Sequence, residues 1–198
     1  MNDWIVDTVE GAMGSPWVFA ALFAFAAIDG FFPLMPSESL VITAGVFAAT
    51  GAPDLAPVIA SAAAGAFAGD HVAYAIGRGA GSRRRSRKQA RLFTWAEGML
   101  DRRGGMILVV CRYIPGARTA ITMTAGAVAY PLRRFSPFDA LAAVSWAAYS
   151  ALVGYVGGAA FEDDPIRGLV LGLGLALAVA ALVELVRHAR RRHMAATR

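Results

Sequence analysis

Residues 105–130, GMILVVCRYIPGARTAITMTAGAVAY, form a long apolar run with two arginines, Arg112 and Arg118, on either side of Pro115 and Gly116. An arginine that faces hydrocarbon is costly, so both must face protein, water or an anion. On an unbroken helix, six residues of separation would place the two side chains on different faces. Because proline interrupts helical hydrogen bonding and glycine permits a reversal, the run predicts a break that points both guanidinium groups at one spot.

The break lies near the middle of a membrane-sized segment. The ten residues from Gly105 to Pro115 would rise about 15 Å as a helix, half of a hydrocarbon core about 30 Å thick. Neither arm is long enough to cross alone. The run is therefore either one kinked span or a re-entrant hairpin whose tip lies at mid-membrane, where irregular backbone requires protein or water beside it.

The composition indicates an all-α polytopic membrane protein. The chain has 198 residues, of which 57% are hydrophobic, and its mean hydropathy is +0.52. The net charge of +5 does not indicate nucleic acid, because the basic residues cluster between the apolar blocks. The lone Cys111 excludes an internal disulfide, and we expect no metal or cofactor. The apolar blocks are residues 17–34, 37–50, 55–77, 105–130, 138–161 and 166–186.

Loop charges predict the orientation. Residues 78–103 hold nine basic side chains and the tail 187–198 holds five, so both should be cytoplasmic. The acidic segment 1–16 has no basic side chain and no signal-peptide pattern, and should lie outside. The expected location is the bacterial cytoplasmic membrane, with the N-terminus outside and the C-terminus cytoplasmic.

Parity then favours re-entrant elements. Arg133 and Arg134 follow run 105–130 and should be cytoplasmic, which is where the run began, so it returns to the same face. The same reasoning makes residues 17–50 return to the outside, with a reversal between Pro33 and Pro36. The block 17–34 would rise about 27 Å as a helix and could nearly cross alone, so two full crossings stay an alternative for this region.

Two hairpins that enter from opposite faces, each followed by a crossing helix, predict an inverted repeat. The sequence contains a weak echo of it, since Ile-Thr-Ala-Gly at 42–45 corresponds to Met-Thr-Ala-Gly at 123–126. We therefore expect one membrane domain over residues 1–198. Its parts are an external segment 1–16, hairpins 17–50 and 105–130, three membrane-spanning helices 55–78, 136–161 and 166–186, a basic loop 79–104 and a basic tail 187–198.

Three carboxylates complete the candidate site. Asp29 and Glu38 are nine residues apart and converge only if the chain folds back between them, and Asp70 lies on the third apolar block. Intramembrane carboxylates that face arginines suit proton-coupled handling of an anion: Arg112 and Arg118 hold a phosphate, while a carboxyl group gains and loses the proton. The alternative is that these charges are buried salt bridges that lock the hairpins together.

Other features receive simpler interpretations. Gly65 and Gly69 form a small-residue face expected to pack against another helix. His71 is interpreted as a helix-end or interfacial side chain rather than as a proton relay. The glycines of residues 77–81 resemble a phosphate-binding loop only superficially, because no buried strand precedes them.

Four motifs together resemble the DedA family of bacterial membrane proteins, also described as SNARE-associated or VTT-domain proteins. The resemblance covers residues 29–158 and implies two opposed re-entrant hairpins and movement of lipids across the bilayer, with undecaprenyl phosphate or phospholipids as substrates and the proton gradient as the driving force. It assigns essential roles to Glu38, Asp70, Arg112 and Arg118, and it departs at Asp29, where many members have glutamate. The motifs are FFPLMPSE at 31–38, GDHVAYAIGRGAG at 69–81, RYIPGAR at 112–118, and Ala125-Gly126 with Trp146.

The sequence thus predicts a flippase or scramblase for an anionic phospholipid or a polyprenyl phosphate such as undecaprenyl or decaprenyl phosphate. Expected partners are membrane lipids and protons, with a homodimer as an open alternative. Rival functions are a proton-coupled small-ion or solute transporter, a structural factor, and a membrane lipid phosphatase. A phosphatase needs a nucleophile and a general acid, and no histidine pair lies near the arginines in the sequence, so we expect a protein that is not an enzyme.

Overall fold

The computed structural model describes residues 14–32, 37–81, 105–113 and 117–160, together with residues 11, 98 and 100. These parts of the chain form helices and no strand, which confirms the all-α prediction for them. The elements are α2 (Trp17–Phe31), α3 (Ser37–Ala49), α4 (Leu55–Gly81), α6 (Met106–Arg112), α7 (Ala117–Ala127) and α8 (Leu132–Ala159).

Two of these helices are long and apolar enough to cross a membrane. α4 has 27 residues and α8 has 28, or about 40 Å each at 1.5 Å per residue. The other four have between 7 and 15 residues, which at the same rise is about 10–22 Å and less than a hydrocarbon core. α2 ends at Phe31, so it is shorter than the block 17–34 that could nearly have crossed.

α8 begins earlier than expected. The sequence predicted a helix from residue 136, but the helix starts at Leu132 and contains Pro137. Pro137 is the sixth residue of α8, where it removes one backbone N–H from the helix ladder, and the helix continues through it. Arg133 and Arg134 therefore lie in the first turn of α8 rather than in a loop before it.

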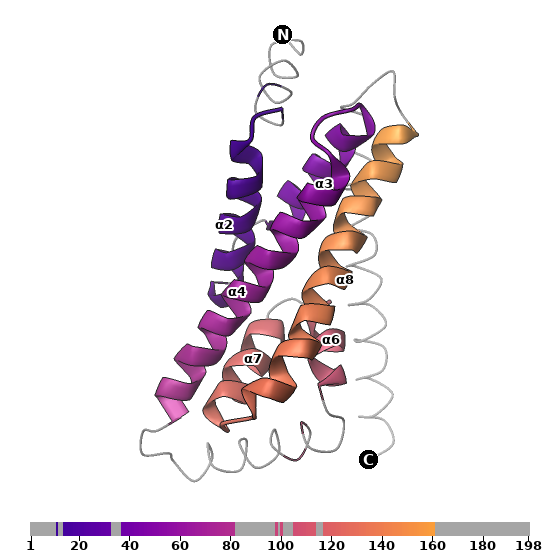
Figure 1. Ribbon diagram of the computed structural model, residues 1–198. Coiled ribbons are helices and arrows are strands. Elements are labelled where there is room, and N and C mark those ends of the chain that lie inside the picture. Colours follow the sequence, from indigo (N-terminus) through magenta and orange to yellow (C-terminus); the bar gives the residue numbers. More distant parts are fainter. Residues whose placement is uncertain are drawn as a thin grey trace, which may run out of the picture.

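The helices form two pairs around a central pair. α4 and α8 extend over the length of the described part, with α2 and α3 toward one end and α6 and α7 toward the other (Figure 1). α2 and α7 pack on α4, whereas α3 and α6 pack on α8. If α2, α3 and α4 are taken to correspond to α6, α7 and α8, each of these packing contacts has an equivalent contact in the other half. This is the pattern that an internal repeat produces.

Glycine contacts show the same correspondence between the two halves at the level of single residues. On α3, Gly45 lies against the carbonyl oxygen of Ala151, and Gly154 of α8 lies against that of Ile42. In the other half, Gly126 of α7 lies against the carbonyl oxygen of Tyr74, and Gly77 of α4 lies against that of Met123. In each pair the carbonyl belongs to the residue three positions before the partner glycine. The weak echo between residues 42–45 and 123–126 therefore corresponds to a shared packing geometry.

Gly65 and Gly69 also pack as expected. They lie against the carbonyl oxygens of Phe23 and Ala27, and neither position leaves room for a Cβ atom. Close backbone contact of this kind is typical of helices packed in a membrane, where small residues allow the van der Waals packing that holds the helices together. The two glycines hold α2 directly against α4.

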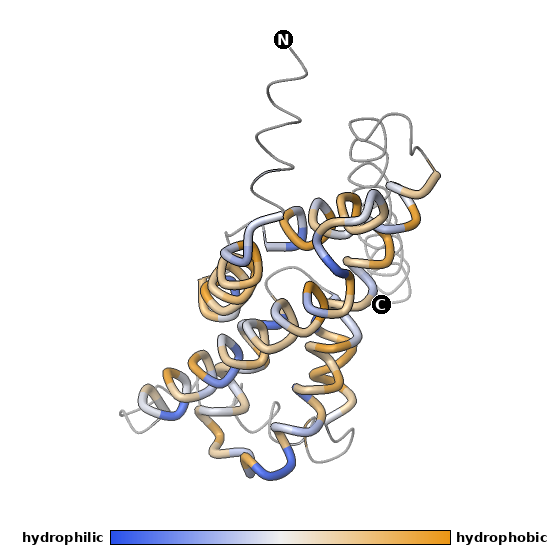
Figure 2. Tube along the Cα trace, turned by 45° about the horizontal axis from the view of Figure 1, so that its top comes forward, coloured by the Kyte–Doolittle hydropathy of each residue, from blue (hydrophilic) through white to orange (hydrophobic). Residues whose placement is uncertain are grey.

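Apolar side chains face outward along the helices. Hydrophobic colours predominate over the traced helices in Figure 2. Exposed large apolar residues are found on α2, α4, α6 and α8, and such a surface suits lipid rather than water. They include Trp17, Phe23, Ile76, Val110, Leu141, Leu152 and Val156.

The buried apolar residues form two separate cores, and a short polar interval of α4 and α8 lies between them. On α4 the first core ends at Ala66 and the second begins at Tyr74, while on α8 the second contains Phe135 and the first begins at Ala143. Asp70, His71 and Asp139 fall in this interval. The candidate site therefore lies where the two cores meet.

Several sequence predictions lie outside the described residues. The helix-breaking Pro33, Pro36, Pro115 and Gly116 are among them, as are the expected spanning helix 166–186 and the basic tail 187–198. Nearly all of the external segment 1–16 and of the basic loop 79–104 are also outside.

Candidate functional site

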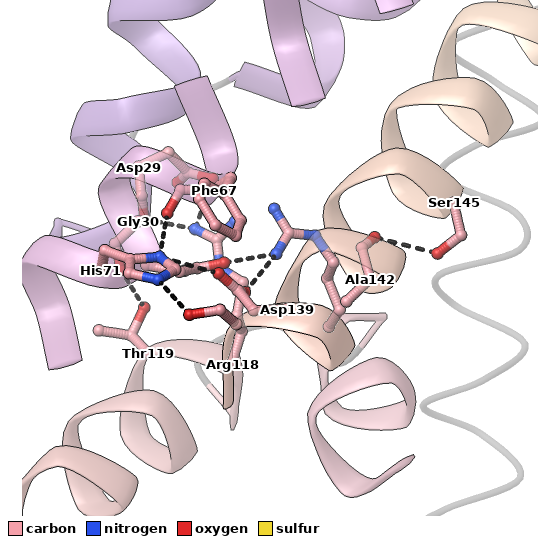
Figure 3. Close-up of polar contacts among 12 residues, drawn as sticks. Asp29, Gly30, Phe67, His71, Arg118, Thr119, Asp139, Ala142 and Ser145 are labelled. Atoms are coloured by element: carbon pink, nitrogen blue, oxygen red, sulfur yellow. Dashed lines mark hydrogen bonds and ion pairs between the residues drawn. The ribbon is translucent and has the colours of Figure 1, made fainter. Parts of the chain in front are cut away.

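Every helix described above contributes a polar side chain to one buried cluster. Figure 3 shows Asp29, His71, Arg118 and Asp139 pointing toward one another from α2, α4, α7 and α8. The hydrogen bonds and ion pairs of the cluster connect segments that are up to 89 residues apart in the sequence. Its members are Asp29 of α2, Ser37 of α3, Asp70 and His71 of α4, Arg112 of α6, Arg118 and Thr119 of α7, and Ser136 and Asp139 of α8.

Arg112 and Asp70 form the centre. A terminal nitrogen of Arg112, Nη1, donates to Oδ2 of Asp70, and both side chains are 1% exposed. The same nitrogen lies 3.8 Å from Oδ1 of Asp139. The guanidinium carbon lies 5.3 Å from the ring centroid of Trp146, within the range of a cation–π interaction. Arg112 is thus held on one edge by carboxylates and on one face by an aromatic ring.

Arg118 joins the two halves of the molecule. Its Nη2 donates to Oδ2 of Asp29 at 2.9 Å and also to the Asp29 carbonyl oxygen, while its Nε lies 3.7 Å from Oδ1 of Asp70. Ser37 donates to the same Asp29 oxygen at 2.8 Å, and Thr119 donates to the Gly30 carbonyl at 3.2 Å. These bonds fasten the end of α2 to the start of α7.

The structure therefore brings both arginines to one carboxylate, Asp70. Asp70 was predicted as one of three carboxylates of the candidate site. Arg112 and Arg118 both contact it, from the two arms of the broken run. Their roles in binding phosphate stay predictions. The contacts equally satisfy the alternative in which the charges lock the hairpins, and only measurements of function separate the two.

Glu38 lies apart from this cluster. Its side chain is exposed, and among the described residues it has no hydrogen bond or ion pair. It is close enough to interact electrostatically with Asp29 and with Tyr149. Among the described residues, Asp29 and not Glu38 forms an ion pair with Arg118, and the proton-coupling role of Glu38 stays a prediction.

Asp139 and His71 belong to the cluster, although neither was predicted as a site residue from the sequence. Nδ1 of His71 donates to the Phe67 carbonyl at 2.9 Å and lies 3.3 Å from Oδ2 of Asp139, while Nε2 lies 2.9 Å from the hydroxyl of Ser136. His71 is therefore a member of the cluster and not a plain interfacial side chain. A signal existed, since Asp139 is the only acidic residue between positions 138 and 160, and an isolated acid in an apolar block marks a candidate site.

Some buried polar atoms of the cluster have no hydrogen-bond partner. They are Nε and Nη2 of Arg112, Oδ1 of Asp70 and Oδ2 of Asp139. Unpartnered buried donors on a cation are costly, so they require an explanation. Two adjacent N–H groups on one guanidinium edge match the spacing of two oxygens of a phosphate or carboxylate. The unpartnered edge of Arg112 therefore has the donor geometry that suits an anion. The described residues hold no group of three or more side chains placed to bind a metal ion.

Comparison with known proteins places the chain in a family. The family model described as the VTT domain matches residues 35–156, which is more than half of the chain. The chain is a VTT-domain protein of the DedA family. An uncharacterized membrane protein of Mycobacterium tuberculosis (strain ATCC 25618 / H37Rv) is 32% identical over 83% of this chain and 76% of its own length. The protein named DedA of Escherichia coli (strain K12) is 26% identical over 88% and 84% of the two chains.

A further relative, the inner membrane protein YghB of Escherichia coli (strain K12), is 29% identical over 84% of this chain and 81% of its own length. No solved structure matches the chain. The resemblance noted from the motifs is thus confirmed, and this VTT-domain protein is a membrane protein. The matched range contains Asp70, His71, Arg112, Arg118 and Asp139, whereas Asp29 lies before it.

Proposed function

We propose that this VTT-domain protein is a lipid transporter that moves an anionic phospholipid or a polyprenyl phosphate across the bacterial cytoplasmic membrane, coupled to protons. The proposal includes the orientation expected from loop charges, with the N-terminus outside and the C-terminus cytoplasmic. In it the protein is not an enzyme, and its partners are membrane lipids, the lipid phosphate and protons.

In this proposal the two helix pairs are re-entrant. α2 with α3 enters from the outer face and α6 with α7 from the cytoplasmic face, while α4 and α8 cross completely. The helix lengths support this, because α6 and α7 rise only about 10 and 16 Å. The exchange of packing partners between the halves supports it too, since an inverted repeat places a binding site at the interface of the repeats near the bilayer midplane.

One observation carries the proposed substrate: Arg112 is buried, yet Nε and Nη2 have no partner. A phosphate would supply two oxygens to this edge as charge-assisted hydrogen bonds. Arg118 lies on the other side of Asp70 and adds a second positive charge. The arginines would thus hold the headgroup of a lipid within the membrane.

The edge of the cluster favours a lipid over a small solute. Arg118 and Asp29 are 11% and 16% exposed, so the cluster reaches the surface there. The residues that follow on α2, Phe31 and Phe32, are large, apolar and exposed. A lipid could place its phosphate against the arginines while its chains remain beside these rings and in the bilayer.

A hydrolase is the rival that a specific observation favours. The Ser136 hydroxyl contacts Nε2 of His71 and Asp139 lies near Nδ1, which are the contacts of a Ser-His-Asp triad. However, the Phe67 carbonyl lies closer to Nδ1 of His71 than Asp139 does, at 2.9 Å against 3.3 Å, so the backbone orients the ring. Release of phosphate or fatty acid from lipid by pure protein, lost in Ser136→Ala, would favour this rival.

Flux in reconstituted vesicles tests the proposal. Vesicles should be prepared with a fluorescent phosphatidylglycerol in both leaflets, and the accessible fraction measured with a membrane-impermeant quencher. The protein should increase exchange between leaflets while leaving the flux of chloride and inorganic phosphate unchanged. Flux of the small ions without lipid exchange would favour a solute transporter.

A further inference from the structure

We propose that Asp139 and His71 form the site at which the coupling proton enters and leaves the buried charge cluster. This inference rests on the proposed lipid transport. It assigns the proton to a pair of residues on α4 and α8 whose contact is seen only in the folded protein.

The balance of charge requires such a site. Two arginines, Arg112 and Arg118, face three aspartates, Asp29, Asp70 and Asp139, so the cluster carries a net charge of −1 when His71 is neutral. A buried net charge is costly. An anion that arrives at Arg112 would raise this charge further, so at least one proton must accompany it.

Asp139 is the least compensated of the three aspartates. Asp29 accepts from Arg118 and Ser37, and Asp70 accepts from Arg112 with Arg118 close by. The nearest arginine nitrogen to Asp139 is 3.8 Å away, and its buried Oδ2 has no hydrogen-bond donor. Because Asp139 and Asp70 share one arginine nitrogen, two ionised carboxylates would repel each other there. A proton is therefore best placed on Asp139.

His71 connects that carboxyl group to the exterior. Its Nδ1–H already serves the Phe67 carbonyl, so Nε2 is the nitrogen that can accept a proton, and the Ser136 hydroxyl can change from donor to acceptor as it does so. The His71 side chain is 26% exposed, while that of Asp139 is 4% exposed. When Nε2 takes up a proton, the imidazolium can release its Nδ1 proton to Oδ2 of Asp139, 3.3 Å away, and the carboxyl group then holds it.

Protonation of Asp139 and anion binding at Arg112 are coupled through their charges. Filling the free edge of Arg112 with an anion adds negative charge beside Asp139, which favours the proton there, and by reciprocity the proton favours the anion. The charged groups that face the pair from the neighbouring helices are Asp70 of α4, Arg112 of α6 and Arg118 of α7.

The first experiment measures coupling as a ratio. Exchange of fluorescent phosphatidylglycerol is recorded in the same vesicles with and without an imposed pH gradient, and the driven rate is divided by the passive rate. The parent chain should give a ratio of several-fold, and Asp139→Asn and His71→Gln should bring it to one. Asp139→Glu should restore it, and Asp54→Asn, an exposed aspartate in the link before α4, serves as the matched control. An unchanged ratio in Asp139→Asn would overturn the proposal, and so would loss of folding in both cluster variants without rescue by Asp139→Glu.

The second experiment does not depend on transport. Nitrogen-15 NMR of labelled histidines in detergent reports the protonated fraction of His71, assigned by its loss in His71→Gln. The proposal expects this fraction at a fixed pH to rise on adding phosphatidic acid, and to fall in Asp139→Asn. A His71 signal that responds to neither would overturn the proton site. If His71 responds but the parent chain moves no lipid, the transport function fails while the proton site stands.

Discussion

At the scale of single residues, Asp70 is the point where the charge cluster is tied together. Arg112 and Arg118 lie on different helices of the broken run, and each brings a guanidinium nitrogen within 4 Å of this carboxylate. Asp70 is 1% exposed, so its charge depends on both arginines. The same arrangement leaves the outer edge of Arg112 free, and in our proposal that edge binds the substrate.

Asp29→Asn should weaken the link between α2 and α7. The asparagine can still accept from Ser37, but Arg118 loses its charged partner in a largely buried position. Arg118 keeps the Asp29 backbone carbonyl as an acceptor, so the cost is the difference between a charged and a neutral hydrogen-bond partner, about 1 kcal/mol. We expect a lower melting temperature in detergent, measured by the loss of monodisperse protein on heating. The exposed Asp54, in the link before α4, provides the control variant Asp54→Asn. Equal melting temperatures for Asp29→Asn and the parent chain would contradict a structural contribution of this pair.

How far the sequence predicts the site depends on the kind of residue. Arg112, Arg118 and Asp70 could be found because a charge in an apolar run is costly and therefore noticeable. Their pairing could not, since it depends on how six helices cross. Asp139 was missed although it is the only acid of its apolar block, and its partner could not be predicted because the contact with His71 depends on how α4 and α8 pack.

At the scale of helices, backbone contact at glycine holds the two halves in equivalent positions. A side chain at Gly77 would meet the backbone of α7, and one at Gly154 would meet the backbone of α3. A clash with backbone cannot be relieved by a rotamer change, so the helices would have to separate. These contacts therefore fix the positions of α3 and α7 against the central pair.

Gly77→Val and Gly154→Val should therefore destabilise the protein to similar degrees. Overpacking in a tight interior costs about 1–3 kcal/mol, and contact with backbone places these positions at the upper end. Gly79 is two residues from Gly77 on the same helix and has no atom within 4 Å of an added Cβ, so Gly79→Val is the matched control. Melting temperatures of the three variants should show two large decreases and one small change. A decrease at Gly79 equal to that at Gly77 would instead indicate an effect of helix propensity.

The sequence predicted the ends of the helices better than their packing. The prolines correctly indicated that α2 ends before Pro33 and that α3 begins after Pro36. The early start of α8 was missed because the expected helix began at residue 136, after Arg133 and Arg134, whereas α8 begins at Leu132 and continues through Pro137. The repeat was visible only as Thr-Ala-Gly at 43–45 and 124–126, since most of its residues need only be small and apolar.

At the scale of the whole molecule, the loop charges predict that residues 1–16 and 79–104 lie on opposite sides of the membrane. Cysteines placed at Thr8 and at Ser86, in a Cys111→Ala background, should react with an impermeant thiol reagent from opposite faces. Intact cells should label Thr8→Cys, and only permeabilised cells should label Ser86→Cys. Labelling of both in intact cells would contradict the double re-entrant arrangement.

The all-helical character and the membrane location were accessible from sequence because a membrane restricts the choices of secondary structure and segment length. The orientation inferred from the basic loops stays a prediction. What remained inaccessible was the joining of the halves, since Arg118 contacts Asp29 across 89 positions of sequence. No local pattern specifies that contact.

The central claim is that the free edge of buried Arg112 holds a lipid phosphate, and lipid flux in Arg112→Lys tests it most directly. Lysine keeps a charge that can pair with Asp70 but has no second N–H edge. Since hydrogen bonds to a charged group contribute about 1.5–3 kcal/mol each, losing that edge should slow exchange by about tenfold or more. Exchange of fluorescent phosphatidylglycerol and melting temperature should be measured on the same preparations. The account predicts strongly reduced exchange with a melting temperature close to that of the parent chain. Parent-like exchange in folded Arg112→Lys would contradict it.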